Sequence, residues 1–174
     1  MVSDDRSAPA GREQAWSDEG PQHGQVVVVT DNPIGRAVVQ IAEAAGRRTT
    51  LLRDEEVDRT PLRWLEENPL TERDAFVMCD HDTPDMETLL RAALAGDAGY
   101  VAMMGSRRRA EKVFESLQDL PTSTLSRLHV PAGLDTGGRS PGEIALSVVA
   151  EVVAVSHGRT GGSMRGRADG SAPA

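Results

Sequence analysis

A run of basic residues carries the clearest chemical signal in this sequence. Gly105 and Ser106 precede Arg107, Arg108 and Arg109, and all five follow the apolar stretch YVAMM. A helix that begins here directs its positive dipole end toward anions, so each arginine in the first turn costs about 0.3 kcal/mol or more unless something offsets it. Backbone N–H groups, a glycine that permits close approach, and guanidinium groups together bind phosphate-type anions. The motif predicts an anion site, with an exposed basic turn as the alternative.

A second cluster of reactive residue types is Cys79-Asp80-His81-Asp82. An imidazole between two carboxylates has a raised pKa and can serve as an acid, a base or a ligand. The alternative is a turn in which Asp82 or Thr83 caps the following helix. Cys79 is either a buried strand thiol or a thiolate that holds a metal or carries sulfur. We assign no set of metal ligands from this pattern.

A third candidate is the glycine-rich loop Pro131-Ala132-Gly133-Leu134-Asp135-Thr136-Gly137-Gly138. Its glycines allow a tight loop, and Asp135 adds a carboxylate. The loop leads into Ser140-Pro141-Gly142-Glu143, which combines a capping box with proline at the first helical position. We therefore expect either a binding loop around Gly133 and Asp135 or a simple turn into the last helix.

The loop after the first apolar run argues against a nicotinamide nucleotide. A dinucleotide-binding turn has glycines that let the backbone approach the pyrophosphate, but among Thr30 to Gly35 only Gly35 is a glycine. Asn32 could adopt the left-handed conformation, while Asp31 places a carboxylate where a phosphate would lie. Arg53, after the second apolar run, is compatible with a 2′-phosphate or with a solvated surface position. We expect NAD(P) not to be a cofactor.

These candidates all follow short apolar runs that alternate with segments of helical periodicity. Such alternation predicts a doubly wound, Rossmann-like α/β domain with a parallel five-stranded sheet and right-handed crossovers, in the strand order 3-2-1-4-5. Ligands of such sheets bind at the carboxyl ends of the strands. The expected strands are residues 26–29, 49–52, 75–79, 100–104 and 128–130.

Composition limits the class of protein. Residues 1–22 and 158–174 are polar and rich in Gly, Ala, Ser and Pro, so we expect two disordered tails around one domain at 23–157. The first tail lacks the apolar region of a signal peptide, and no apolar run approaches the roughly 18 residues of a membrane span. A net charge of −8 disfavours non-specific nucleic-acid binding. These features predict a cytoplasmic protein with neither membrane nor nucleic-acid partners, and a homodimer is compatible with them.

Three stretches, in order, resemble the XdhC/CoxI family, the accessory proteins of xanthine and carbon monoxide dehydrogenases. They are Asp80-His81-Asp82 followed by Asp85, then AGYVAMMGSRRR, then HVPAGLDTGGRSPGEIALSVVAEVVAV. The resemblance covers residues 25–157, although Thr30 to Pro33 stand where the family has a glycine loop. It implies the Rossmann-like domain of that family.

The resemblance also implies a function: binding molybdenum cofactor (molybdopterin), sheltering it and helping to deliver it to a molybdenum hydroxylase client. The residues expected to contact the cofactor are Gly105, Ser106, Arg107, Arg108, His81, Asp82, Asp135 and Gly133. This interpretation favours a cofactor-binding chaperone over a turnover enzyme. The alternatives are an NAD(P)-dependent oxidoreductase and a regulatory or scaffold domain without a ligand.

Overall fold

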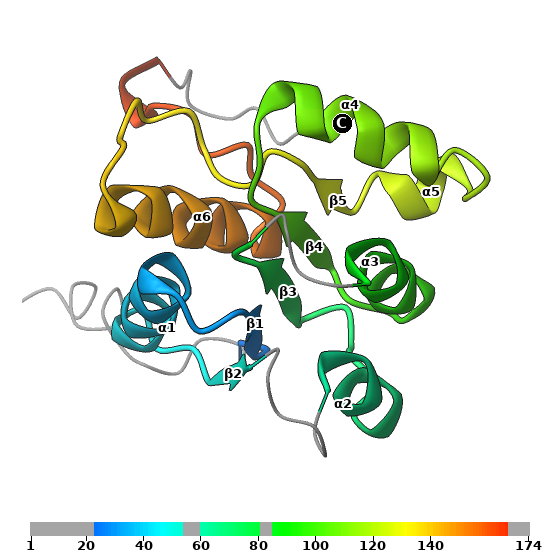
Figure 1. Ribbon diagram of the computed structural model, residues 1–174. Coiled ribbons are helices and arrows are strands. Elements are labelled where there is room, and N and C mark those ends of the chain that lie inside the picture. Colours follow the sequence, from blue (N-terminus) through cyan, green and yellow to red (C-terminus); the bar gives the residue numbers. More distant parts are fainter. Residues whose placement is uncertain (1–22, 54–59, 81–84, 167–174) are drawn as a thin grey trace, which may run out of the picture.

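The computed structural model describes residues 23–53, 60–80 and 85–166. Its centre is a parallel sheet of five strands (Figure 1), namely β1 (Val26–Val29), β2 (Thr49–Leu52), β3 (Ala75–Met78), β4 (Tyr100–Met103) and β5 (Leu128–His129). The helices are α1 (Pro33–Ala44), α2 (Pro61–Glu67), α3 (Met86–Ala95), α4 (Arg107–Ser116), α5 (Thr122–Leu125), α6 (Pro141–Ser156) and the 3₁₀ turn η2 (Met164–Gly166). The predicted Rossmann-like α/β class is confirmed.

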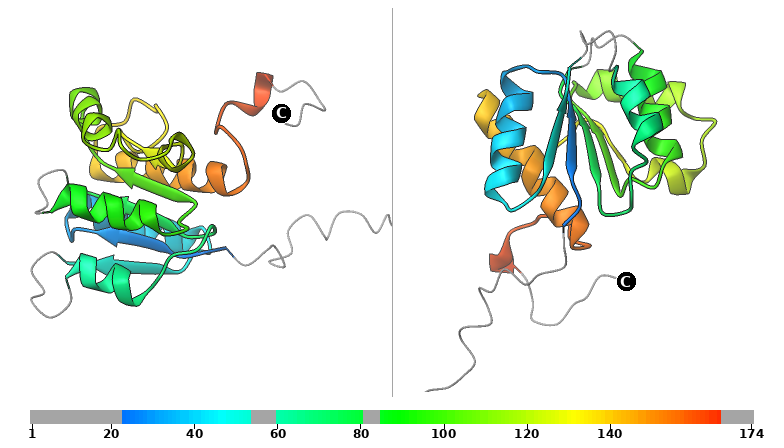
Figure 2. Two further views of the ribbon diagram at one scale, coloured as in Figure 1. Left: turned by 90° about the vertical axis from the view of Figure 1, so that its right-hand side faces the viewer. Right: turned by 90° about the horizontal axis from the view of Figure 1, so that it is seen from below.

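Helices cover both faces of the sheet, as Figure 2 shows in its right-hand view. Because successive strand side chains point to opposite faces, Val26 and Val28 pack with α1 and α6 in one core cluster. Val27 and Val29 pack with α2, α3 and α4 in the other. All four valines are fully buried, which is the reason for the continuous apolar run.

The order of the strands is 2-1-3-4-5, whereas the sequence predicted 3-2-1-4-5. β1 therefore pairs with β2 on one side and with β3 on the other. The residue types explain the difference: β3 is AFVM and is buried throughout, whereas Thr49 and Thr50 of β2 are partly exposed. A strand that is apolar on both faces belongs in the interior of a parallel sheet, and the strand with polar residues lies at its edge.

Local capping sets where the helices begin. Asn32, Thr60, Ser106 and Ser140 are N-caps whose side chains accept a hydrogen bond from the backbone of their own first turn. α3 begins at Met86 with Asp85 as its N-cap residue, later than predicted from Asp82 and Thr83, which lie outside the described residues. No helix in the described part of the chain is both long and apolar enough to cross a membrane.

Candidate functional site

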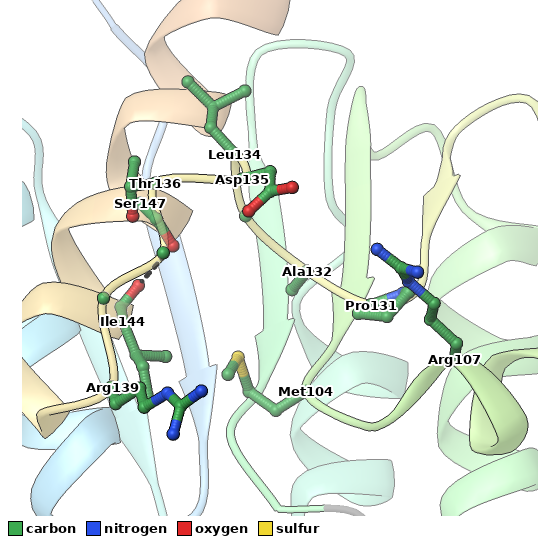
Figure 3. A pocket seen from close by; sticks show the side chains of 13 residues that line it. Met104, Arg107, Pro131, Ala132, Leu134, Asp135, Thr136, Arg139, Ile144 and Ser147 are labelled. Atoms are coloured by element: carbon green, nitrogen blue, oxygen red, sulfur yellow. Dashed lines mark hydrogen bonds between the residues drawn. The ribbon is translucent and has the colours of Figure 1, made fainter.

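A pocket of about 490 Å³ lies at the carboxyl edge of the sheet, between the loops that follow β4 and β5. The beginning of α6 closes its third side. Figure 3 shows Arg107 and Arg139 at opposite ends of this pocket, with Met104 and the loop around Asp135 between them. The position agrees with the expectation that ligands of a parallel sheet bind where the strands end. The lining residues are Met104, Arg107, Pro131, Ala132, Gly133, Leu134, Asp135, Thr136, Gly137, Gly138, Arg139, Ile144 and Ser147.

The turn between β4 and α4 supplies the first arginine. Ser106 caps α4, and its Oγ accepts a hydrogen bond of 3.2 Å from the backbone N–H of Arg109. A Cβ at Gly105 would lie 3.3 Å from Cγ of Arg109, so the turn leaves little room for a larger residue. The three arginines do occupy the first turn of α4, as the sequence predicts.

These arginines do not all face the pocket. Arg107 lines it, whereas Ser106 and Arg108 line a separate hollow of about 500 Å³, together with Arg109 and Lys112. Successive helix positions are about 100° apart around the axis, so neighbouring arginines point to different surfaces.

The predicted contact residues are therefore only partly brought together. Arg107, Gly133 and Asp135 line one pocket, while Gly105, Ser106 and Arg108 are not among its lining residues. His81 and Asp82 lie outside the described residues.

The loop after β5 is held against the sheet and against α6 by its backbone. Ala132 N–H donates to the carbonyl of Met103 at 3.0 Å, and Leu134 N–H donates to the carbonyl of Ser147 at 3.2 Å. Gly133 has φ +98°, and a Cβ there would lie 2.5 Å from Oγ of Ser147. Only glycine fits this conformation and this spacing without strain.

The predicted capping box at the start of α6 is confirmed. Ser140 Oγ accepts from the N–H of Glu143, and Glu143 Oε2 accepts from the N–H groups of Arg139 and Ser140 at 3.0 Å each. These hydrogen bonds, first of all that from Ser140, lower the pKa of Glu143. The capping box fixes the backbone of Arg139, whose side chain enters the pocket.

Sequence reasoning missed Arg139 as a pocket residue. The signal was a basic residue between a glycine pair and a capping box, at the point where the chain returns to the carboxyl edge of the sheet.

The pocket combines two cations with one carboxylate. Arg107, Asp135 and Arg139 are all exposed, and no ion pair of their side chains occurs within residues 23–53, 60–80 and 85–166. The one buried hydroxyl of the lining, Ser147 Oγ, already donates to the carbonyl of Ile144 at 2.8 Å. This arrangement suits binding of an anionic ligand that also carries hydrogen-bond donors.

The loop after β1 has a different character. Asp31 forms ion pairs with Arg36 and Arg53, and the side chain of Arg53 is 56% exposed, so Arg53 is a surface arginine with a carboxylate partner. Asn32 is extended at φ −117° and serves as the N-cap of α1, while Thr30 has the positive φ, +86°. The suggestion that Asn32 adopts the left-handed conformation is therefore wrong, and the residue with a positive φ is Thr30, two positions earlier.

Cys79 is a buried strand-end thiol. Its side chain is 3% exposed, and burial, helped by the negative charge of Asp80, raises the pKa of the thiol to about 12. A thiol with this pKa is protonated at neutral pH when nothing is bound to it, which favours the interpretation of a buried strand thiol.

The chain is similar to two curated bacterial proteins, one of them linked by name to xanthine dehydrogenase. It is 30% identical over 93 residues to the uncharacterized protein YqeB of Escherichia coli, covering 52% of this chain and 17% of that protein. It is 27% identical over 100 residues to a probable xanthine dehydrogenase subunit of Bacillus subtilis, covering 58% of this chain and 29% of that protein. The chain thus spans less than a third of either relative.

Comparison with solved structures supports the fold. A crystal structure of a xanthine dehydrogenase from Bacillus halodurans superposes with a TM-score of 0.65 at 20% identity, covering 79% of this chain and 44% of that one. Residues 26–152 match the family model described as the XdhC Rossmann domain. Because that match extends over most of the chain, the protein belongs to the XdhC family.

Proposed function

We propose that this protein binds molybdenum cofactor in the pocket between the β4 and β5 loops and assists its delivery to a molybdenum hydroxylase. The proposal rests on one observation: Arg107, Arg139 and Asp135 line the same pocket, on a chain of the XdhC family. The client would be of the xanthine or carbon monoxide dehydrogenase type, in the cytoplasm.

The size and charge of the pocket fit this ligand. Its volume of about 490 Å³ lies within the range of roughly 300–1,000 Å³ that is usual for small-molecule sites. Molybdopterin carries negative charge on its phosphate and on its dithiolene, which are both attached to its pyran ring, while its pterin ring carries N–H donors. The two guanidinium groups of the pocket (Figure 3) give it the positive charge that such an anionic ligand requires.

Each part of the lining has a separate task in this proposal. Arg107, at the N-terminus of α4, binds the phosphate through charge-assisted hydrogen bonds, and Arg139 offers a second guanidinium group to the ligand. Asp135 accepts hydrogen bonds from the amino and ring N–H groups of the pterin. Met104 and Ile144 offer apolar surface to the ring. The molybdenum–sulfur chemistry belongs to the cofactor, and these side chains bind it and orient it.

The open form of the site supports a role in transfer. Arg107, Asp135 and Arg139 are exposed, so a ligand held between them can leave toward a docked protein without unfolding of the domain. The name of the Bacillus subtilis relative, which describes it as part of a probable xanthine dehydrogenase, supports a client of that class.

The proposal is tested by producing the protein in cells supplied with molybdate and measuring molybdenum and pterin in the purified protein. Wild type is expected to retain both in equal amounts. The double variant Arg107→Ala/Arg139→Ala should lose at least about nine-tenths of them, since losing two charge-assisted bonds costs more than about 1.4 kcal/mol. Arg108→Ala/Lys112→Ala, which removes the same charge from the neighbouring hollow, is the matched control. Absence of pterin from wild type, or equal loss from both variants, would overturn the proposal.

A further inference from the structure

One carboxylate lies behind the pocket loop and joins four parts of the fold. Glu151 is on α6, and its Oε2 accepts hydrogen bonds from the hydroxyl of Tyr100 at 2.6 Å and from the backbone N–H of Gly133 at 2.8 Å. Its Oε1 lies 3.3 Å from Nδ1 of His129. The contacts thus connect α6 with β4, with β5 and with the loop that lines the pocket.

The surroundings of Glu151 keep its carboxylate an acceptor of hydrogen bonds and keep the Tyr100 hydroxyl a donor. Burial alone would raise the pKa of Glu151, but hydrogen bonds from His129, Tyr100 and Gly133 outweigh it and lower that pKa. Burial and the neighbouring carboxylate raise the pKa of Tyr100, so its hydroxyl remains a donor. The ring of His129 stacks on Tyr100 with centroids 4.4 Å apart, which restricts the motion of both rings.

The Gly133 hydrogen bond acts on the part of the loop that determines the shape of the pocket. Gly133 lies at φ +98° in close contact with Ser147, and the next residue bonds to the Ser147 carbonyl. Asp135 follows two residues later and lines the pocket. The path of the chain from Gly133 to Asp135 therefore depends on how firmly Gly133 is held on α6.

We infer that Glu151 is a positioning residue of the pocket: it fixes the Gly133–Asp135 backbone from behind, so that Asp135 faces the same ligand as Arg107 and Arg139. Glu151 is not itself among the lining residues. That this ligand is molybdenum cofactor rests on the function proposed above, whereas the positioning of the loop by Glu151 does not.

Two substitutions distinguish geometry from charge. In Glu151→Gln the amide oxygen can accept from Tyr100 and Gly133, while the NH₂ group donates to Nδ1 of the neutral histidine tautomer. In Glu151→Ala the Gly133 N–H and the Tyr100 hydroxyl both lose the carboxylate, which leaves the Gly133 N–H only its interaction with the Tyr100 oxygen. Leu146→Ala, at a side chain that is 56% exposed on the same helix, is the control for α6.

The direct readout is hydrogen exchange of single backbone amides, measured by NMR without any ligand. We compare exchange of the Gly133 amide with that of the Ala132 amide in the same protein, because Ala132 donates to Met103 instead and corrects for any change in overall stability. The ratio of the two rates should rise at least about tenfold in Glu151→Ala and stay within about threefold of wild type in Glu151→Gln and Leu146→Ala.

If Glu151→Ala does not fold, the same measurement on wild type and on Tyr100→Phe decides the question. Tyr100→Phe removes one donor to Glu151 and leaves the Gly133 contact in place, so the Gly133 amide should be protected in both proteins. An unprotected Gly133 amide in either overturns the positioning role.

The second readout is the molybdenum and pterin retained by the same proteins. Loss from Glu151→Ala with retention in Glu151→Gln is the expected pattern. Unchanged Gly133 exchange in Glu151→Ala overturns the positioning role whatever is bound. Faster Gly133 exchange with no pterin in wild type supports the positioning role and contradicts only the proposed function.

Discussion

Arg53 Nε lies 2.8 Å from Oδ2 of Asp31, and this ion pair connects the carboxyl ends of β2 and β1. The other oxygen of the same carboxylate is bound by Arg36. Hydrogen bonds from Arg36 and Arg53 lower the pKa of Asp31, so the carboxylate is ionised at neutral pH and paired with both guanidinium groups. In a dinucleotide-binding domain the pyrophosphate occupies this position.

Nicotinamide nucleotides should therefore bind weakly. We expect dissociation constants of about 1 mM or more for NADH and NADPH, a binding free energy of roughly −4 kcal/mol or weaker, because Thr30 and Asn32 replace the glycines that let the backbone approach the pyrophosphate. Isothermal calorimetry with each nucleotide measures this. A micromolar constant for either would contradict it and would favour an oxidoreductase.

Two adjacent arginines should differ in their effect on ligand binding. Arg107→Ala should lower retention of molybdenum and pterin at least about tenfold, since a hydrogen bond to a charged group contributes roughly 1.5–3 kcal/mol. Arg108→Ala should leave retention unchanged, because Arg108 lines the separate hollow. Both variants should keep or slightly gain folding stability, because each removes a positive charge from the helix N-terminus. A loss of several kcal/mol of stability with unchanged retention would make Arg107 structural.

Stability should depend on the ionisation of Glu151. The pKa of the Glu151 carboxyl is lower in the folded state than in the unfolded state. Ionised Glu151 therefore stabilises the protein fully at pH values above its unfolded-state pKa of about 4.3, and this contribution is lost as the pH falls through the folded-state pKa. Glu151→Gln should therefore be less stable than wild type by about 1–3 kcal/mol at pH 7, and the difference should shrink toward about pH 3. Urea denaturation of both proteins across that range measures the effect. A difference that does not change with pH would show that the charge does not contribute.

The thiol of Cys79 should be unreactive until the protein unfolds. With its pKa raised to about 12, alkylation by iodoacetamide at pH 8 should be at least about a hundredfold slower than for a free cysteine, whose pKa is about 8.5. In guanidinium chloride the single cysteine should react at the normal rate. Rapid labelling of the folded protein would contradict the buried assignment.

Two glycines, one in the pocket loop and one in α6, should respond oppositely to alanine. Gly133→Ala should destabilise the protein by about 1–3 kcal/mol, because Gly133 has a positive φ and a Cβ would meet Ser147. Gly142→Ala, in the first turn of α6 where a Cβ meets nothing within 4 Å, should be neutral or stabilising by up to about 1 kcal/mol. Thermal unfolding of both variants tests this, and equal behaviour would contradict the tight packing of the pocket loop.

The sequence by itself determined the elements and most of their ends. The run Val26–Val29 predicts a strand buried on both faces, and Ser140 with Glu143 predicts the start of α6; both are found. These features depend on residues a few positions apart, whose backbone preferences and hydrogen bonds act locally.

Only the tertiary structure decided which of the candidate residues meet. The side of β1 on which β3 pairs is a long-range choice, and the alternation of strands and helices does not specify it. The separation of Arg107 from Arg108 depends on how α4 is rotated against the sheet. Tyr100, His129, Gly133 and Glu151 are far apart in sequence, and only the packing of α6 against β4 and β5 brings them together. Contacts of this kind depend on shape and burial over the whole domain, which no local pattern of residues encodes.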